Sequence, residues 1–231
     1  MTVFRLKQLA SNSVHAAAGA VRWNYDKVEM IADGVVHAVG ISAGLVAATV
    51  LVVLTAIYAS ALDIVVVSIY VAGLLSMLVL SATYNLWPVS PTKWVLRRFD
   101  HSAIYVLIAA TYTPFIAALQ DHLFAAALLV GVWGVAVFGI VLKLVLPGRF
   151  DRLAVGLYLA IGWSGIMLYD AVVKALPAMA LGFIVAGGVL YSLGVIFHAW
   201  QRLRFQNAIW HCFVLLGAAC HYTAILDMVL T

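Results

Sequence analysis

The sequence predicts an all-α integral membrane protein, a bundle of seven transmembrane helices with its N-terminus in the cytoplasm and its C-terminus outside. Three observations support this prediction: the composition, the lengths of the apolar runs and the distribution of the basic residues. Of the 231 residues, 66% are hydrophobic and 10% are charged, and the mean hydropathy is +1.10. Soluble domains carry about 25% charged residues, so this composition is typical of a protein buried in a bilayer.

Seven apolar runs are long enough to cross a membrane, since a spanning helix needs about 20 mostly apolar residues. The predicted spans are 34–58, 64–87, 102–119, 123–146, 153–173, 177–200 and 208–230. The chain is therefore expected to have a cytoplasmic N-terminal segment at 1–33 and one transmembrane domain at 34–230. The turns at 61–63 and 120–122 are short, and hydropathy alone would also allow six spans.

The basic residues favour the count of seven. With seven spans, 12 of the 13 Lys and Arg residues fall on the side of the N-terminus, and Lys174 falls on the other side. Basic residues are retained in the cytoplasm during membrane insertion, which predicts the orientation. It also explains the isoelectric point of about 9.1 without a nucleic-acid partner.

Polar side chains from three predicted spans are expected at one depth, just below the cytoplasmic surface. Ser81 and Asn85 lie near the end of the second span, Asp100 precedes the third, and Asn207 and His211 begin the seventh. Polar and ionisable residues inside a membrane are costly and mark functional sites. The sequence therefore predicts a polar pocket at this level.

Their spacing suits hydrolytic metal chemistry. Ser81 and Asn85, like Asn207 and His211, are one helical turn apart and point the same way. A hydrolytic zinc site needs three protein ligands, a water and a nearby carboxylate. His211 is the candidate metal ligand, because asparagine binds zinc weakly. Asp100 is the candidate general base and Ser81 a candidate catalytic hydroxyl.

Three further polar residues, Glu29, Asp33 and His37, follow one another at intervals of four along the start of the first span. They could cap and anchor this helix, or they could line the same pocket. Farther along the span, Gly40-x-x-x-Gly44 offers a small face for close helix packing.

Several motifs in this chain are similar to those of a known family. The segments concerned are Glu29-x-x-x-Asp33-x-x-x-His37, Ser81-x-x-Tyr84-Asn85, 97–105 (RRFDHSAIY), 110–115 (ATYTPF), 162–163 (GW), 187–195 (GGVLYSLGV) and 208–211 (AIWH). In these motifs, over nearly its whole length, the chain resembles the bacterial hemolysin III family, part of the progestin and adipoQ receptor (PAQR) superfamily.

The resemblance implies a seven-helix receptor-like bundle with a cytoplasmic N-terminus. In the adiponectin-receptor branch, three histidines bind an intramembrane zinc beside a serine and an aspartate. By position, the serine and aspartate correspond to Ser81 and Asp100, and the histidines to Asn85, Asn207 and His211. Asp33 also departs from the family, which usually has asparagine there. The resemblance thus implies a zinc site with two of its three ligands replaced. Asp33 or His37, from the first span, could take the place of the missing ligands.

Three functions remain open on this basis. The first is sensing or homeostasis of membrane lipid by a multi-pass protein of the bacterial cytoplasmic (inner) membrane, with a membrane lipid or fatty acid as ligand. The second is metal-dependent hydrolysis of a lipid amide or ester, as in the related alkaline ceramidases. The third is pore formation, which the family name suggests, although the spans lack the repeated charged ring of a channel.

Overall fold

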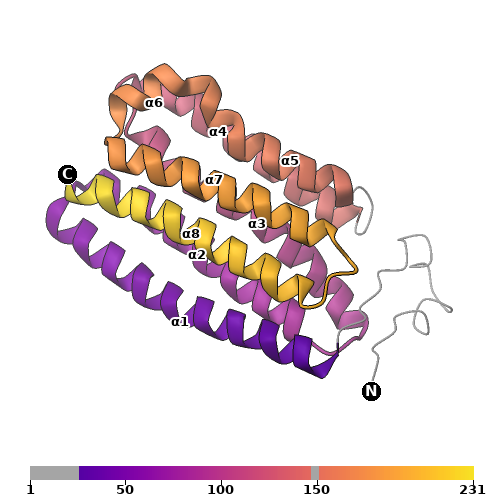
Figure 1. The fold of residues 1–231 in the computed structure, drawn as a ribbon. Helices are drawn as coiled ribbons and strands as arrows, with labels where there is room; N and C mark the ends of the chain where they lie inside the picture. The colour runs from indigo at the N-terminus through magenta and orange to yellow at the C-terminus, as the bar shows by residue number, and fades with distance from the viewer. Residues whose placement is uncertain (1–25, 147–150) are drawn as a thin grey trace.

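The fold is seen in a computed structural model that describes residues 26–146 and 151–231 (Figure 1). Within these ranges every regular element is a helix. The elements are α1 (Lys27–Tyr58), α2 (Ala61–Leu86), α3 (Pro91–Ala117), α4 (His122–Val145), α5 (Asp151–Trp163), the 3₁₀ helix η4 (Ser164–Leu168), α6 (Tyr169–Ala175), α7 (Ala178–Ala199) and α8 (Gln206–Leu230). Most of the predicted segment 1–33 lies outside the described residues.

The prediction of an all-helical, multi-pass membrane protein is confirmed. Five helices, α1, α2, α4, α7 and α8, are long and apolar enough to cross a bilayer, and a sixth span results if α5 and α6 are taken together. The helix α3 is 27 residues long but carries several charged residues in its first half. The count of seven spans and the orientation of the termini stay predictions.

The first helices begin earlier than their apolar runs, because polar residues cap them. Asp26 accepts hydrogen bonds from the N–H groups of Val28 and Glu29, and the Glu29 side chain bonds back to the Asp26 N–H. This capping box satisfies N–H groups that a helix start leaves free. Ser90 caps α3 in a similar way, so α3 begins at Pro91 rather than at 102.

The predicted span at 153–173 is one broken stretch rather than one straight helix. The segments Leu153–Met167 and Tyr169–Ala175 meet at an angle of 69°. Tyr112 from α3 contacts the stretch before this bend, where α5 passes into η4: its hydroxyl is 2.9 Å from the carbonyl oxygens of both Ile161 and Gly162, and it accepts a hydrogen bond from the Gly165 N–H. Within a bilayer, such a break requires protein groups that satisfy the exposed backbone.

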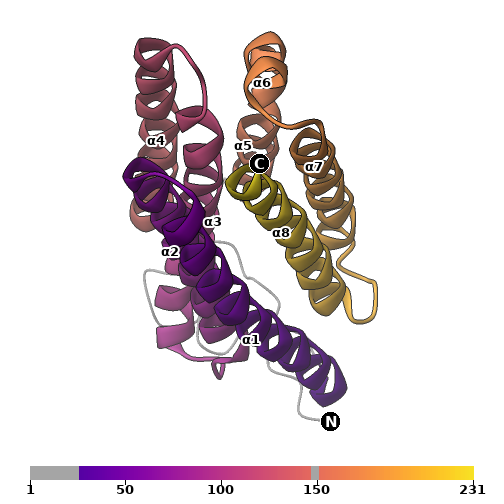
Figure 2. The same ribbon diagram turned by 90° about the vertical axis from the view of Figure 1, so that its left-hand side faces the viewer.

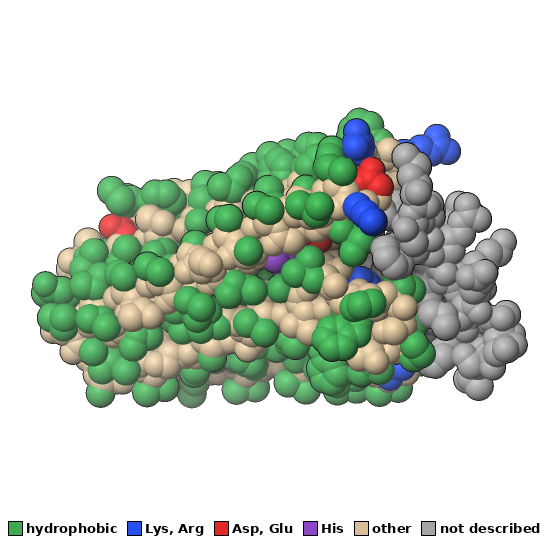
Figure 3. All heavy atoms as spheres, turned by 90° about the horizontal axis from the view of Figure 1, so that it is seen from below, with side chains coloured by type: hydrophobic (Ala, Val, Ile, Leu, Met, Phe, Trp, Pro, Cys, Tyr) green, Lys and Arg blue, Asp and Glu red, His purple; other side chains and the backbone are tan. Residues whose placement is uncertain are grey.

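The first and last long helices are neighbours. The helix α1 packs against both α2 and α8, and α8 packs against α7 (Figures 1 and 2). The flank seen in Figure 3 is covered mainly by apolar side chains, and its Lys and Arg side chains gather at the end where α1 and α8 begin. The polar residues expected to form the pocket lie near this end.

Small residues on the buried face of α1 bring this helix close to its neighbours. The buried positions of α1 recur every three or four residues, which marks one helix face. They are Asp33, His37, Gly40, Gly44, Ala48, Leu51 and Thr55. A Cβ atom at Gly40 would lie 2.7 Å from Leu215 Cδ2 of α8, and one at Gly44 would collide with Leu78 of α2. The predicted close packing at Gly40 and Gly44 is confirmed.

A close approach between α2 and α3 at Gly73 yields a test of glycine-mediated packing. A Cβ at Gly73 would lie 2.5 Å from the Cβ of Ala110, an atom that cannot move without its backbone. We expect Gly73→Ala to lower the free energy of unfolding by about 1–3 kcal/mol through overpacking. The control is Gly131→Ala in α4, where a Cβ meets nothing within 4 Å. Equal melting temperatures for the two variants in detergent would contradict this packing.

Candidate functional site

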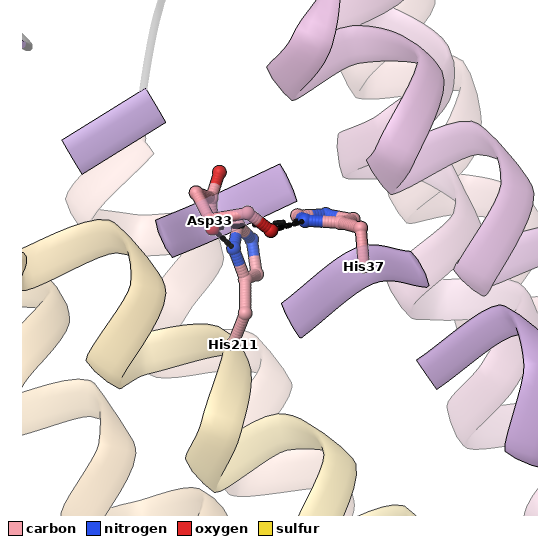
Figure 4. Close-up of side chains that lie close together, drawn as sticks. All are labelled: Asp33, His37 and His211. Atoms are coloured by element: carbon pink, nitrogen blue, oxygen red, sulfur yellow. Dashed lines mark hydrogen bonds and ion pairs between the residues drawn. The ribbon is translucent and has the colours of Figure 1, made fainter. Parts of the chain in front are cut away.

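Three ionisable side chains meet between α1 and α8 (Figure 4). The Nδ1 atom of His211 lies 2.6 Å from Oδ1 of Asp33, and Nδ1 of His37 lies 3.6 Å from the same oxygen. The two imidazole rings are 4.4 Å apart between centroids. Asp33, His37 and His211 are only 5%, 7% and 8% exposed. They form a buried cluster, called here the Asp–His cluster.

A ring of hydrogen bonds surrounds this cluster and links three helices. Asn207 donates from Nδ2 to Oδ2 of Asp33 at 2.9 Å and to Oδ1 of Asn85 at 3.1 Å. Asn85 donates to the Ser81 hydroxyl at 3.3 Å, which in turn lies 3.3 Å from Nε2 of His37. The ring closes where Nδ1 of His37 donates to the Asp33 carbonyl oxygen at 2.8 Å.

This ring fixes the roles of the His37 nitrogens. A carbonyl oxygen can only accept, so Nδ1 of His37 carries a hydrogen. In the neutral ring Nε2 then accepts from the Ser81 hydroxyl and keeps its lone pair toward α2. The two asparagines occupy positions that the resemblance assigns to zinc-binding histidines, but here their amides bond to a carboxylate and to each other.

The start of α8 is tied to the start of α1. Phe205 precedes α8 with φ 59° and ψ 18°, a left-handed conformation that costs a non-glycine residue about 1–3 kcal/mol, and its N–H donates to Oε1 of Glu29 at 2.9 Å. The other oxygen of Glu29 accepts from the Asp26 N–H. One carboxylate therefore aligns the two helix ends, so that Asn207 faces Asp33. The sequence left open whether Glu29, Asp33 and His37 cap the first helix or line the pocket. Glu29 caps α1, whereas Asp33 and His37 line the site.

Asp100 approaches the site from α3, just ahead of the predicted span at 102–119. Burial raises the pKa of Asp100 to about 6, against the opposing effects of His211, the Ser81 hydroxyl and the Arg97 guanidinium. These interactions show that the carboxyl group lies near Ser81 and His211, as the sequence predicted. A carboxyl group that titrates near neutrality is suited to proton transfer.

Lys93, near the start of α3, supplies positive charge beside the site. Its Nζ donates to the carbonyl oxygens of Asn85 at 2.9 Å and Trp87 at 2.8 Å, at the C-terminal end of α2. Burial lowers the pKa of Lys93 to about 8, while Asp33 and Asp100 act in the opposite direction. The ammonium group therefore offsets part of the negative charge that the two carboxylates bring.

A small cavity adjoins the Asp–His cluster. Its volume is about 20 Å³, and its walls come from three helices: Val36 and His37 of α1, Met77, Leu78 and Ser81 of α2, and His211, Val214 and Leu215 of α8. A cavity needs about 10–15 Å³ to hold one water. The cavity wall is almost entirely apolar, although His37, Ser81 and His211 border it. In Figure 3 a histidine is visible between apolar side chains on the flank of the bundle.

The structure brings together the residues that the sequence singled out, with one unexpected link. Ser81, Asn85, Asn207 and His211 share one network, as their spacing predicted. The direct pair between Asp33 and His211 was not foreseen, because it joins residues 178 positions apart. The signal that could have found it is the spacing of four between Asp33 and His37, which repeats in Asn207 and His211.

The residues present do not fit zinc bound by three imidazoles at positions 85, 207 and 211. Two of these positions hold amides, and the Asn207 nitrogen donates to Asp33 and Asn85. A different donor set does fit a metal. One ligand-type atom from each of Asp33, His37 and His211 lies within 4.8 Å of the others. The donors available are thus two imidazoles and one carboxylate.

Fold and site together define a multi-pass α-helical membrane protein with a buried polar site between its first and last helices. The family model described as "Haemolysin-III related" matches residues 27–222, and the chain belongs to this family. It is 37% identical over 198 residues to the hemolysin-3 homolog of Bacillus subtilis (strain 168), covering 86% of this chain and 93% of the relative. It is 31% identical to hemolysin-3 of Bacillus cereus, covering 87% and 92%.

A more distant relative extends the relationship beyond bacteria. The human monocyte to macrophage differentiation factor is 28% identical over 163 residues, covering 68% of this chain and 67% of the relative. Membership of the PAQR superfamily, expected from the motifs, is supported by this match. The resemblance seen in the sequence is confirmed.

The Asp–His cluster leads to a stability prediction. Asp33→Ala removes the acceptor of His211 and one acceptor of Asn207, and a buried donor without a partner costs about 1–3 kcal/mol. We expect the free energy of unfolding to fall by at least about 2 kcal/mol, measured by denaturation in detergent. Asp170→Ala, at an exposed aspartate of α6, is the control. A variant at Asp33 as stable as the native protein would show that the network contributes nothing to folding.

Proposed function

We propose that this protein binds a membrane lipid or fatty acid at the buried site and takes part in sensing or homeostasis of membrane lipid. The observation that carries the proposal is the setting of the cavity: Val36, Met77 and Leu78 give it apolar walls, and His37 and Ser81 border it. At about 20 Å³ the cavity has room for a water rather than an acyl chain, so the lipid would place its carbonyl or head group at this point and its chain along the apolar flank of the bundle. A lipid has the same two-part character, an acyl chain next to a carbonyl or head group. Small-molecule sites generally combine apolar walls with a few polar groups that fix orientation.

The proposal also covers the number of membrane spans and the orientation of the bundle in the membrane. The protein would cross the bacterial cytoplasmic membrane seven times, with the part of α3 from residue 102 onward and the broken α5–α6 stretch each counted as a span. The basic end of the bundle would face the cytoplasm. The site would then lie just below the cytoplasmic surface and exchange ligand sideways with the inner leaflet.

Two neighbouring residues of α1 permit a test of lipid binding. Val36 lines the cavity, whereas Val35 is 56% exposed on the flank. We expect Val36→Trp to block the cavity and reduce crosslinking of a photoactivatable fatty acid to α1 and α8 in liposomes several-fold. Val35→Trp should leave crosslinking at this site unchanged. Equal crosslinking of both variants, each with a native melting temperature, would contradict a lipid ligand at this cavity.

A second candidate, a hydrolase of lipid amides or esters, is favoured by the groups around the cavity. A water there would have His37, Ser81 and His211 around it, with Asp100 close by. In this mechanism Asp100 takes a proton from water, whose oxygen bonds to the substrate carbonyl carbon. The Ser81 hydroxyl donates to the developing oxyanion. The carbon–nitrogen or carbon–oxygen bond then breaks, and the proton passes to the leaving amine or alcohol. A metal ion would add Lewis acidity at the carbonyl.

The hydrolase candidate has a direct test. Purified protein in detergent should release fatty acid from a ceramide-like substrate, and Asp100→Ala should reduce the rate by about 10²-fold or more, as expected for loss of a general base. Asp170→Ala should keep the full rate. Turnover that survives Asp100→Ala unchanged, or comes equally from boiled protein, would exclude this mechanism.

A further inference from the structure

We propose that Asp33, His37 and His211 bind one divalent first-row transition metal ion, with Asn207 and Asn85 holding the carboxylate ligand in place. The site spans α1 and α8, so it differs from a site built on positions 85, 207 and 211. It depends on neither the lipid proposal nor the hydrolase candidate, because a metal can be structural or catalytic.

The donor groups of the cluster suit a transition metal ion. Two imidazoles and one carboxylate form a set that binds zinc in hydrolases and iron(II) in oxygenases. All three residues are less than 9% exposed, and a buried carboxylate is strongly disfavoured without a positive or hydrogen-bonding partner. A divalent cation would satisfy it at the point where both imidazoles converge.

Hydrogen bonds hold His37 and Asp33 in orientations that suit metal ligands. A metal-binding histidine usually donates its second N–H to a carbonyl or carboxylate, which fixes the ring. His37 does this with Nδ1, through its 2.8 Å bond to the Asp33 carbonyl oxygen. Nε2 of His37 is then the metal-binding atom, and the ion would replace the 3.3 Å hydrogen bond that Nε2 accepts from the Ser81 hydroxyl. The carboxylate of Asp33 is fixed likewise: Asn207 holds Oδ2 at 2.9 Å and leaves Oδ1 toward the two rings.

The contact between Asp33 and His211 indicates what the ion would replace. Their 2.6 Å separation is that of a hydrogen bond with one proton between oxygen and nitrogen. Two ligand atoms on a tetrahedral zinc are roughly 3.3 Å apart, given bonds of about 2.0–2.1 Å. Binding therefore exchanges this proton for the cation, and the pair opens by less than about 1 Å.

The cavity beside the ligands leaves room for a fourth ligand. The cavity of about 20 Å³ borders His37 and His211 together with Ser81. It has room for one water, which would take the bound ion as its main partner and complete a four-coordinate ion that has three protein ligands. The Ser81 hydroxyl is then positioned to hydrogen-bond to that water.

Metal content tests the proposal directly. Protein without an affinity tag is purified in detergent, stripped with chelator, reloaded with Zn²⁺ alone and analysed by elemental mass spectrometry. We expect about one zinc per chain, as for a structural or catalytic site, and loss of stoichiometric zinc in His37→Ala, His211→Ala and Asp33→Asn. His122→Ala, at an exposed histidine of α4, should retain all of it.

His37 is the decisive residue, because it contributes nothing to a site at positions 85, 207 and 211. Zinc retained in full by His37→Ala, or no zinc in the reloaded native protein, would overturn the proposal. X-ray absorption of the loaded native protein gives a reading that needs no variant: two imidazole ligands are expected, and three would contradict the assignment. Lipid crosslinking and fatty-acid release are separate measurements, so the failure of either leaves this result interpretable.

Asn207 is a positioning residue in this site. Its effect should appear in the affinity for zinc and not in the number of zinc ions bound. Asn207→Ala should still bind one zinc but with a dissociation constant about 10–100-fold higher, the usual effect of losing a group that orients a ligand. An unchanged dissociation constant would show that Asn207 does not orient the carboxylate. The melting temperature of the stripped variant, compared with that of the stripped native protein, reports any general loss of stability.

Discussion

The site depends on how closely α1 approaches its neighbours. Gly40 and Gly44 lie on the same helix face as Asp33 and His37, and the absence of side chains there lets Leu215 of α8 and Leu78 of α2 pack against the backbone. Larger residues at the two glycines would move α1 outward and separate the carboxylate from the imidazole it contacts. In a bilayer, where apolar side chains gain nothing by leaving lipid for protein, such close packing is a main source of helix association.

Burial of the Asp33 carboxylate governs the composition of the rest of the site. Its two oxygens accept from His211 and Asn207, and Lys93 adds positive charge nearby. The asparagines therefore have a structural role of their own: the amide of Asn207 uses both hydrogens to link Asp33 with Asn85. Imidazoles at these positions could not make the same pair of bonds, since each ring nitrogen donates at most one hydrogen.

Much of this was readable from the sequence, and what was not has physical reasons. Hydropathy found every long helix, and helical spacing placed Ser81, Asn85, Asn207 and His211 on facing surfaces. The start of α1 was missed because hydropathy ignores capping, although Asp26 and Glu29 form a capping box. The pair of Asp33 and His211 was missed because the neighbours of a helix depend on how the bundle closes. The change from α5 to η4 near Gly162 and Gly165 was hidden because Tyr112, which hydrogen-bonds to the backbone there, lies on another helix.

The packing of α1 against α8 has a consequence for biosynthesis. Asp33 and His211 are 178 residues apart, which at about 5–20 residues per second is roughly 10–35 seconds of translation. During that interval the first helix has entered the membrane while the last is still unmade, so the carboxylate lacks its imidazole and amide partners. The pair of Asp33 and His211 can form only after α8 has been made and packs against α1, so completion of the site is a late step of assembly.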